Sequence, residues 1–390
     1  MTEGYGDTNL PYAVAVSRRW SGTRVVSRYG DRVVELAALA DAGVLPREPW
    51  WTAPSLNAFL ASGPDVWRAV RQRLGEVVGD AGSPDAATRA RVGPAFHPVE
   101  DVQLVLPVEV ADYVDFYASE HHATNLGRIL RPGQEPLPTN WRHLPAGYHG
   151  RSGTVVVSGT PVVRPNGQRR PDADAPPVFG PSERLDVEVE VGFVVGVGSS
   201  PGRPVAVDAF ADHVFGVVLV NDWSARDIQA WEFAPLGPFL GKSFATSISP
   251  WVVPLDALAA ARLPVASSGA DHLLPYLRES EPWGLDIDLE LWVNGEVVSR
   301  PPYASMYWSP AQMLAHLTGN GARLRTGDLY ASGTVSGAAP DQVGSLIERW
   351  GNERFLADGD EVVIAATAPA VGGGRIGLGD VRGRVLPAGG

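Results

Sequence analysis

The clearest pattern along the chain is an alternation of apolar and acidic residues at the start of the segment Leu185–Gly198. In this part the apolar residues Leu185, Val187, Val189 and Val191 alternate with Asp186, Glu188 and Glu190. A period of two on valine-rich sequence predicts a strand, with Glu188 and Glu190 on one face about 7 Å apart. From Gly192 onward the segment is continuously apolar, which indicates burial on both faces. An acidic strand face is commonly solvated, but at the edge of a buried region paired carboxylates repel unless a cation lies between them.

The first 107 residues are predicted to form a small domain of their own. Short strands are expected at Tyr12–Val16, Thr23–Ser27 and Arg32–Leu36, and helices at Ala37–Gly43, Ser55–Leu60 (with Ser55 as its N-cap) and Val66–Val78. This segment contains one histidine, His97, and no acidic cluster with an evident chemical task. We therefore expect it to be structural or to form an interface.

Residues 108–390 are expected to form a second, β-rich domain. Strands are predicted at Thr154–Ser158, Val162–Arg164, Asp186–Val197, Val214–Val220, Trp251–Pro254, Leu285–Val293, Glu296–Ser299, Asp328–Ser332 and Asp360–Ala366. Helices are expected near residues 118–130 and at Ser309–His316, with Ser309 as N-cap. Many short strands separated by Gly and Pro indicate a mainly β fold, a roll or distorted sandwich.

Composition excludes several classes of function. The 390 residues are 44% hydrophobic, which is ordinary for a globular protein that buries a large core. A net charge of −12 argues against nucleic acid as a partner, since phosphate binding needs a basic face. No apolar run is long enough to span a membrane, and no secretory signal opens the sequence. The chain has no cysteine, which excludes disulfides and thiolate sites, and we expect a cytoplasmic protein.

A single lysine stands out among the basic residues. Of the 32 lysines and arginines only Lys242 is a lysine, so arginine fills every other basic position. A genomic bias against lysine explains the general scarcity. Lysine and arginine are not interchangeable where a compact ammonium is needed, so we expect Lys242 to belong to a functional site.

Four carboxylates are candidates for one metal site. Asp222 ends a predicted buried strand and Asp115 lies in the sequence Val-Asp-Phe-Tyr; either alone is equally well explained as a structural residue. With Glu188 and Glu190 they form an all-oxygen set, which suits Mg²⁺, Ca²⁺ or Mn²⁺ rather than Zn²⁺. The pair His121-His122 follows Asp115 closely and offers an imidazole to activate water, but composition does not choose between the two.

Long motifs in the chain resemble the fumarylacetoacetase family. They are DFYASEHHATNLGRILRPGQEPLPTNWRHLPAGYHGRSGTVVVSGTPVVRPNGQ, LDVEVEVGF, VNDWSARDIQAWEFAPLGPFLGKSFATSISPWVVP, YASGTVSG, GSLIERW and, near the N-terminus, NLPYAVAV. The resemblance covers essentially the whole chain. It implies an SH3-like domain at residues 1–107, a catalytic β-roll at residues 108–390 and a homodimer. The implied activity is metal-dependent hydrolysis of the carbon–carbon bond of 4-fumarylacetoacetate to fumarate and acetoacetate, the last step of tyrosine and phenylalanine catabolism.

The resemblance also assigns roles by position. Its metal ligands are Asp115, Glu188, Glu190 and Asp222, with Mg²⁺ or Ca²⁺ as cofactors, and its second cation site involves Asp222, Lys242 and Thr246. The implied catalytic histidine is His122, oriented by Glu348. Lys242 and Gln229 are implied donors to a developing oxyanion, whereas Arg226 either adds positive charge or pairs with Asp227. Substrate contacts fall on Tyr117, Arg131, Tyr148, Gln229, Phe233 and Thr334.

Two departures from the family pattern leave the substrate less certain than the reaction type. Phe233 stands where the family has a tyrosine, so a hydrogen bond to the substrate is expected to be missing, and the segment after Trp350 is short. An alternative is therefore hydrolysis of another β-diketo acid, of the acylpyruvate type, on the same scaffold. A second alternative is a metal-binding β module without catalytic activity.

Overall fold

The N-terminal part of the chain forms a five-stranded sheet covered by helices. The computed structural model describes residues 4–83, 85–172 and 174–389. The sheet has the order β4-β3-β2-β1-β5, and its neighbouring strands are antiparallel. Its strands are β1 (Tyr12–Ser17), β2 (Thr23–Tyr29), β3 (Arg32–Glu35), β4 (Phe96–Pro98) and β5 (Val102–Val105), and its helices are α1 (Leu36–Asp41), α2 (Asn57–Leu60), α3 (Pro64–Ala81) and α4 (Ala86–Val92).

Helix α3 shows why this part folds as it does. Proline occupies its first position, where a missing N–H costs nothing, and its buried residues recur every three to four positions: Trp67, Val70, Leu74, Val77 and Val78. One expected boundary is wrong. Helix α2 begins at Asn57 with Leu56 as N-cap, because the Ser55 hydroxyl reaches the N–H of Asn57 only at 3.4 Å.

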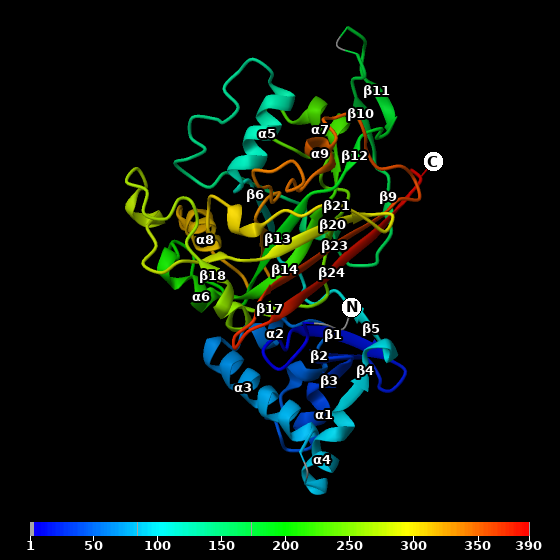
Figure 1. The fold of residues 1–390 in the computed structure, drawn as a ribbon, viewed down its shortest axis with the longest axis vertical. Helices are drawn as coiled ribbons and strands as arrows, with labels where there is room; N and C mark the ends of the chain where they lie inside the picture. Colours follow the sequence, from blue (N-terminus) through cyan, green and yellow to red (C-terminus); the bar gives the residue numbers. More distant parts are fainter. Residues whose placement is uncertain (1–3, 84, 173, 390) are drawn as a thin grey trace.

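The N-terminal sheet packs directly against the rest of the molecule (Figure 1). Tyr12 and Val252 exchange two backbone hydrogen bonds of 2.9 and 2.8 Å, and the rings of Tyr12, Phe59 and Trp67 surround Phe215. The two parts therefore share one apolar cluster. The boundary predicted at residue 107 falls between β5 and β6 and stays a prediction.

The remaining residues form two large sheets that pack together as a β-roll (Figure 1). The first follows the order β7-β6-β22-β13-β14-β16-β8, with β17 paired to β14, and the second the order β21-β20-β23-β24-β9. Strands of the first are β6 (Tyr113–Phe116), β7 (Gly147–His149), β8 (Val155–Val157), β13 (Val189–Val195), β14 (Val214–Asp222), β16 (Thr246–Ile248), β17 (Val253–Pro254) and β22 (Leu329–Ala331). Those of the second are β9 (Val162–Val163), β20 (Asp288–Val293), β21 (Glu296–Ser299), β23 (Glu361–Pro369) and β24 (Arg375–Leu386).

Short strand pairs and helices complete the fold. The pairs are β10 (Asn166–Arg169) with β11 (Val178–Pro181), β12 (Leu185–Asp186) with β15 (Ser224–Ala225), and β18 (Arg262–Leu263) with β19 (Gly284–Leu285). The helices are α5 (Glu120–Leu130), α6 (Phe210–His213), α7 (Arg226–Glu232), α8 (Pro310–Thr318) and α9 (Leu346–Arg349). Ser309 caps α8 in a capping box with Gln312, as the sequence predicted. The mainly β fold class is confirmed.

The alternating segment differs from its prediction in one respect. The expected strand is interrupted, because β12 ends at Asp186 and β13 begins at Val189. At the interruption the side-chain oxygen of Asn221 accepts the N–H of Glu188 at 3.2 Å, in place of a strand carbonyl. All three acidic residues are buried, so the solvated strand face is excluded.

Candidate active site

Four carboxylates converge at one end of the first large sheet. Asp115 comes from β6, Glu190 from β13 and Asp222 from the last position of β14, while Glu188 lies just before β13. The sheet order brings these strands together, since β22 pairs with both β6 and β13, and β13 pairs with β14. Each residue offers one oxygen, and these oxygens all lie within 4.8 Å of one another. All four are buried, so the set predicted from sequence forms one cluster.

Lys242 and its neighbours satisfy two of these carboxylates. The Lys242 ammonium donates to Glu188 and to Asp222 Oδ2, the latter at 2.7 Å. Asp222 also accepts hydrogen bonds from Thr246 Oγ1 at 2.8 Å and Tyr148 Oη at 2.9 Å. Burial alone would raise the pKa of Glu188, but the charges of Lys242 and Arg226 lower it to about 2. Three predicted site residues are thus joined to the cluster.

The other two carboxylates have buried oxygens without such partners. Both oxygens of Glu190 and Oδ1 of Asp115 are buried without a hydrogen-bond partner among the described residues. Burial raises the pKa of Glu190 well above its usual range, and repulsion from Asp115 and Asp222 raises it further. Uncompensated buried carboxylates are costly, and hard divalent cations bind carboxylate oxygens of this kind. The donor set therefore fits Mg²⁺, Ca²⁺ or Mn²⁺.

His122 lies next to the cluster and is oriented by Glu348. Its Nδ1 is 2.7 Å from Glu348 Oε2, and both side chains are buried. The carboxylate also accepts hydrogen bonds from Asn125 at 2.9 Å, from Ser345 at 2.6 Å and from Ser336. An ionised Glu348 accepts a hydrogen bond from the Nδ1–H of His122. In the neutral imidazole the other ring nitrogen, Nε2, therefore carries no hydrogen and can accept a proton.

One cavity joins these groups. It has a volume of about 300 Å³ and its wall includes His122 and the cluster residues Asp115 and Glu188. The predicted substrate residues Tyr117, Arg131, Tyr148, Gln229 and Thr334 also line it, as do Lys242 and Arg226. The buried hydroxyl of Thr334 has no hydrogen-bond partner among the described residues. His121 is only half-buried and does not line this cavity, which distinguishes the two neighbouring histidines.

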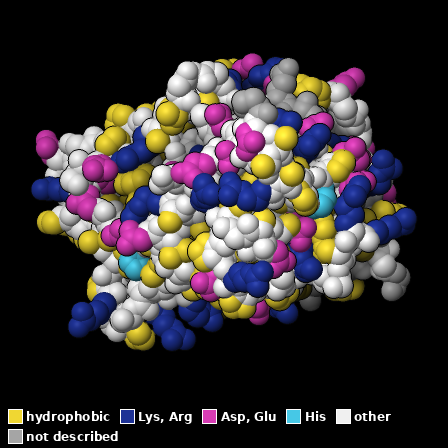
Figure 2. All heavy atoms as spheres, turned by 90° about the horizontal axis from the view of Figure 1, so that it is seen from below, with side chains coloured by type: hydrophobic (Ala, Val, Ile, Leu, Met, Phe, Trp, Pro, Cys, Tyr) yellow, Lys and Arg dark blue, Asp and Glu magenta, His cyan; other side chains and the backbone are white. Residues whose placement is uncertain are grey.

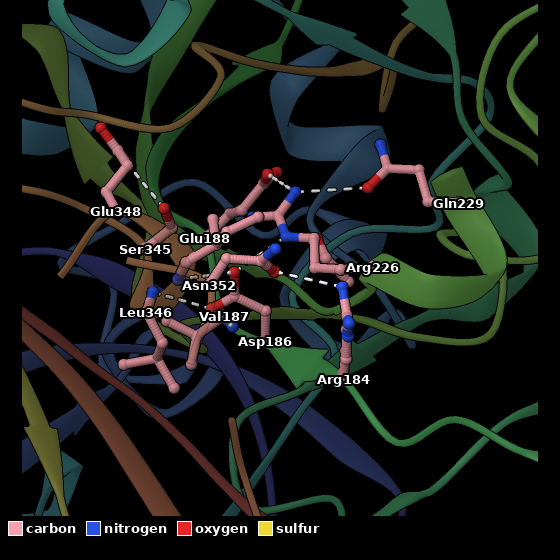
Figure 3. Close-up of polar contacts among 12 residues, drawn as sticks. Arg184, Asp186, Val187, Glu188, Arg226, Gln229, Ser345, Leu346, Glu348 and Asn352 are labelled. Atoms are coloured by element: carbon pink, nitrogen blue, oxygen red, sulfur yellow. Dashed lines mark hydrogen bonds and ion pairs between the residues drawn. The ribbon is translucent and has the colours of Figure 1, made fainter. Parts of the chain in front are cut away.

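Arg226 bridges two acidic residues of the alternating segment (Figure 3). Its Nε donates to Asp186 Oδ2 at 2.8 Å and its Nη1 lies 2.7 Å from Glu188 Oε1. The expected alternative pairing with Asp227 is wrong. That carboxylate instead accepts hydrogen bonds from the Ser182 hydroxyl at 2.6 Å and from the N–H of Glu183 at 2.8 Å, because it points toward the segment between β11 and β12.

Two predicted substrate residues lie at or beyond the edge of the cavity. Phe233, the residue after α7, is 51% exposed and does not line the cavity, so the structure does not place it against the substrate. Arg131 lines the mouth and is exposed, with its Nη2 donating to the carbonyl of Pro136 at 2.8 Å.

Several supporting residues were missed by sequence reasoning. Asn125, Ser336 and Ser345 hold Glu348. No local motif connects Asn125 or Ser336 with Glu348, whereas Ser345 stands three residues before it in a Ser-x-x-Glu pattern that is visible in the sequence. The sequence did contain a signal for Asp186, since it belongs to the same alternation as the two predicted glutamate ligands.

The outer face of the N-terminal part carries charged side chains of both signs. On the face that carries the N-terminal sheet, basic and acidic side chains are interspersed (Figure 2), which is typical of a solvated surface. Within the described ranges, none of the helices has the length and apolar character that a bilayer span requires.

Comparisons with known proteins agree with this geometry. The sequence profile of the fumarylacetoacetate hydrolase C-terminal domain matches residues 112–386, and that of the fumarylacetoacetase N-terminal domain matches residues 8–107. The chain is 43% identical to fumarylacetoacetase of Rattus norvegicus and 42% identical to that of Homo sapiens, in each case over 97% of this chain and 96% of the relative. A fumarylacetoacetate hydrolase structure from Exiguobacterium antarcticum has the same fold, with a TM-score of 0.59, 17% identity and coverage of 97% of this chain and 99% of the other. The chain belongs to the fumarylacetoacetate hydrolase family.

Proposed function

We propose that this protein is an enzyme that hydrolyses the carbon–carbon bond of 4-fumarylacetoacetate to fumarate and acetoacetate. The observation that carries the proposal is the buried carboxylate cluster, two of whose members, Asp115 and Glu188, share a cavity wall with His122, the partner of Glu348. Identity of about 40% or more to fumarylacetoacetases over nearly the whole chain supports the same activity. In the organism this reaction ends tyrosine and phenylalanine catabolism.

A divalent cation held by Asp115, Glu188, Glu190 and Asp222 would supply Lewis-acid polarisation of the diketone. His122 carries out the proton transfers. Its free ring nitrogen takes a proton from water, and the resulting hydroxide adds to the fumaroyl carbonyl carbon. When the carbon–carbon bond breaks, the electron pair stays with the acetoacetate fragment, and the proton on His122 passes to that carbon. Glu348 keeps the imidazole oriented and stabilises its charged form.

Two further side chains are placed to hold the carbonyl oxygen on which charge develops. Lys242 uses two of its three N–H groups on Glu188 and Asp222, which leaves one for the substrate. The side-chain oxygen of Gln229 accepts from Arg226 at 3.3 Å, which leaves its NH₂ group free to donate (Figure 3). Donors fixed in this way stabilise an oxyanion strongly. Arg131 at the mouth offers a planar fork to a terminal carboxylate of the substrate.

The test is turnover by the purified protein of two substrates, 4-fumarylacetoacetate and acetylpyruvate, with products identified chromatographically. We expect fumarate and acetoacetate in equal amounts, loss of activity in chelator, and recovery with Mg²⁺, Ca²⁺ or Mn²⁺. Faster turnover of acetylpyruvate would assign the acylpyruvate-type activity instead. Full activity after exhaustive chelation would contradict the metal requirement. Inactivity on both substrates would favour the alternative of a metal-binding β module without catalytic activity.

Two properties complete the proposal. We infer a homodimer, because the family resemblance implies one, and sedimentation of the purified chain tests it. We also infer a cytoplasmic location, since the sequence has no cysteine and so no disulfide that would need an oxidising compartment. Fractionation of cells that produce the full-length chain tests the location.

A further inference from the structure

Asp186 is a fully buried carboxylate that lies outside the cavity, yet it receives four hydrogen bonds (Figure 3). Its Oδ2 accepts from Arg226 Nε at 2.8 Å and from the N–H of Ile347 at 3.2 Å. Its Oδ1 accepts from the N–H of Leu346 at 2.8 Å and from that of Val187 at 2.7 Å. Three of the four donors come from segments 40, 160 and 161 residues away in sequence, and the fourth is the next residue, Val187.

The first connection runs to the carboxylate cluster. Arg226 donates through Nε to Asp186 and through Nη1 to Glu188, so a single planar guanidinium fixes the position of one carboxylate relative to the other. Arg226 also contacts the Gln229 side chain at 3.3 Å, which extends the same restraint to the cavity wall.

The second connection runs to the catalytic histidine. Leu346 and Ile347 are the first two residues of α9, whose opening N–H groups have no partners within the helix, and Asp186 accepts both. One residue further on, Glu348 contacts His122. Ser345, just before the helix, donates to Glu348 at 2.6 Å. The hydrogen bonds at the first residues of α9 therefore fix the position of the Glu348 carboxylate.

We propose that Asp186 is a positioning residue that fixes the ligand carboxylate Glu188 and the histidine-orienting carboxylate Glu348 in one relative geometry. The inference rests on the proposed function for its catalytic part, whereas its effect on ion binding is independent of the reaction. Asp186 touches neither substrate nor ion. It acts through Arg226 on one side and through α9 on the other.

The test is Asp186→Asn, which keeps the volume and one acceptor oxygen but turns an NH₂ group toward the N–H groups of Arg226 and Ile347. We expect kcat and the affinity for Ca²⁺, measured calorimetrically without substrate, each to fall by about 10- to 100-fold, as for other residues that support metal ligands. The matched control is Asp328→Asn, another buried, arginine-neighboured aspartate remote from the cavity. This control substitution should lower thermal stability and leave kcat and Ca²⁺ affinity within about twofold of the parent values.

A double-mutant cycle separates positioning from general destabilisation. Glu348→Gln alone should lower kcat and leave Ca²⁺ affinity unchanged. In that background Asp186→Asn should cost less in kcat than it does in the parent, because part of its effect is already lost. Additive losses in kcat, or an Asp186→Asn variant that behaves like Asp328→Asn, would overturn the proposal.

The outcomes also distinguish this inference from the proposed function. If the parent hydrolyses neither substrate but Asp186→Asn weakens Ca²⁺ binding, the reaction assignment fails and the positioning of Glu188 stands. If Asp186→Asn does not fold, Arg226→Lys tests the first connection, because one ammonium cannot bridge both carboxylates as the guanidinium does. Unchanged Ca²⁺ affinity in Arg226→Lys would then overturn the inference.

Discussion

Divalent cations should stabilise the folded protein, because they relieve the buried carboxylates that no side chain satisfies. Glu190 is fully buried with both oxygens unpartnered among the described residues, and Asp115 has one such oxygen. The unfolded chain has no comparable cluster, since its four members are separated by as many as 107 positions, from Asp115 to Asp222. An ion that binds only the folded state raises stability by mass action.

The size of the effect follows from the ion concentration and the chain length. At an ion concentration of about 100 Kd the gain is about 2.7 kcal/mol. For 390 residues the unfolding entropy is about 0.8 kcal/mol per kelvin, from about 2.1 cal/mol/K per residue. Tm should therefore rise by about 3 °C, and by a further degree or two at tenfold higher concentration.

Differential scanning calorimetry of chelator-treated protein, with Mg²⁺, Ca²⁺ or Mn²⁺ added back, measures this shift. Glu190→Gln should abolish the response, because it removes a ligand from the centre of the cluster. Glu279→Gln is the matched control, since that glutamate is partly buried near α8 and outside the cavity, and it should keep the full shift. A Tm that no divalent ion changes, or an undiminished shift in Glu190→Gln, would refute the assignment of these carboxylates as ligands.

Three further outcomes are expected. His122→Ala should lower kcat by about 10²- to 10⁴-fold with little change in KM, as measured in steady-state assays, and a small loss would point to another base. Phe233→Tyr should leave KM within about twofold, since the ring is half exposed outside the cavity; a clear fall in KM would restore its substrate contact. Burial raises the pKa of Glu279 to about 7 from 4.5, so the folded state binds this proton more tightly, and the stability this gives below pH 4.5 is lost as the pH rises to 7. Between pH 5 and 8 the Tm of the parent should therefore fall more than that of Glu279→Gln.

The sequence predicted those parts of the site that depend on local pattern. The valine-rich alternation placed Glu188 and Glu190 together, and the apolar run before Asp222 placed that carboxylate at a strand end, as β14 shows. Strand positions were recovered to within a few residues over most of the second domain. The long strand β24 was missed because glycines interrupt its alternation at Gly377, Gly379 and Gly383.

What the sequence could not reveal are contacts between distant segments. The Arg226–Asp186 pair spans 40 residues and the contact of Asp186 with Leu346 spans 160, so no periodicity encodes either of them. From sequence alone, the neighbouring carboxylate Asp227 was an equal candidate for the partner of Arg226. The structure decides, because the pairing of β12 with β15 puts Asp186 opposite Ser224, two residues before Arg226.

Positive charge is distributed unevenly over the four carboxylates of the cluster. Lys242 and Arg226 both bind Glu188, and Lys242 also binds Asp222, so these two carboxylates carry their countercharge in the fold itself. Within the described part of the chain, neither cation forms a hydrogen bond or ion pair with Glu190, which is fully buried and does not line the cavity that Asp115 lines. A core that held all four carboxylates without an ion would have to protonate Glu190 and Asp115, which is the direction in which burial moves their pKa values. The compact ammonium of Lys242, the only lysine, thus supplies countercharge to Glu188 and Asp222, and Glu190 and Asp115 are the carboxylates that we expect a divalent cation to neutralise.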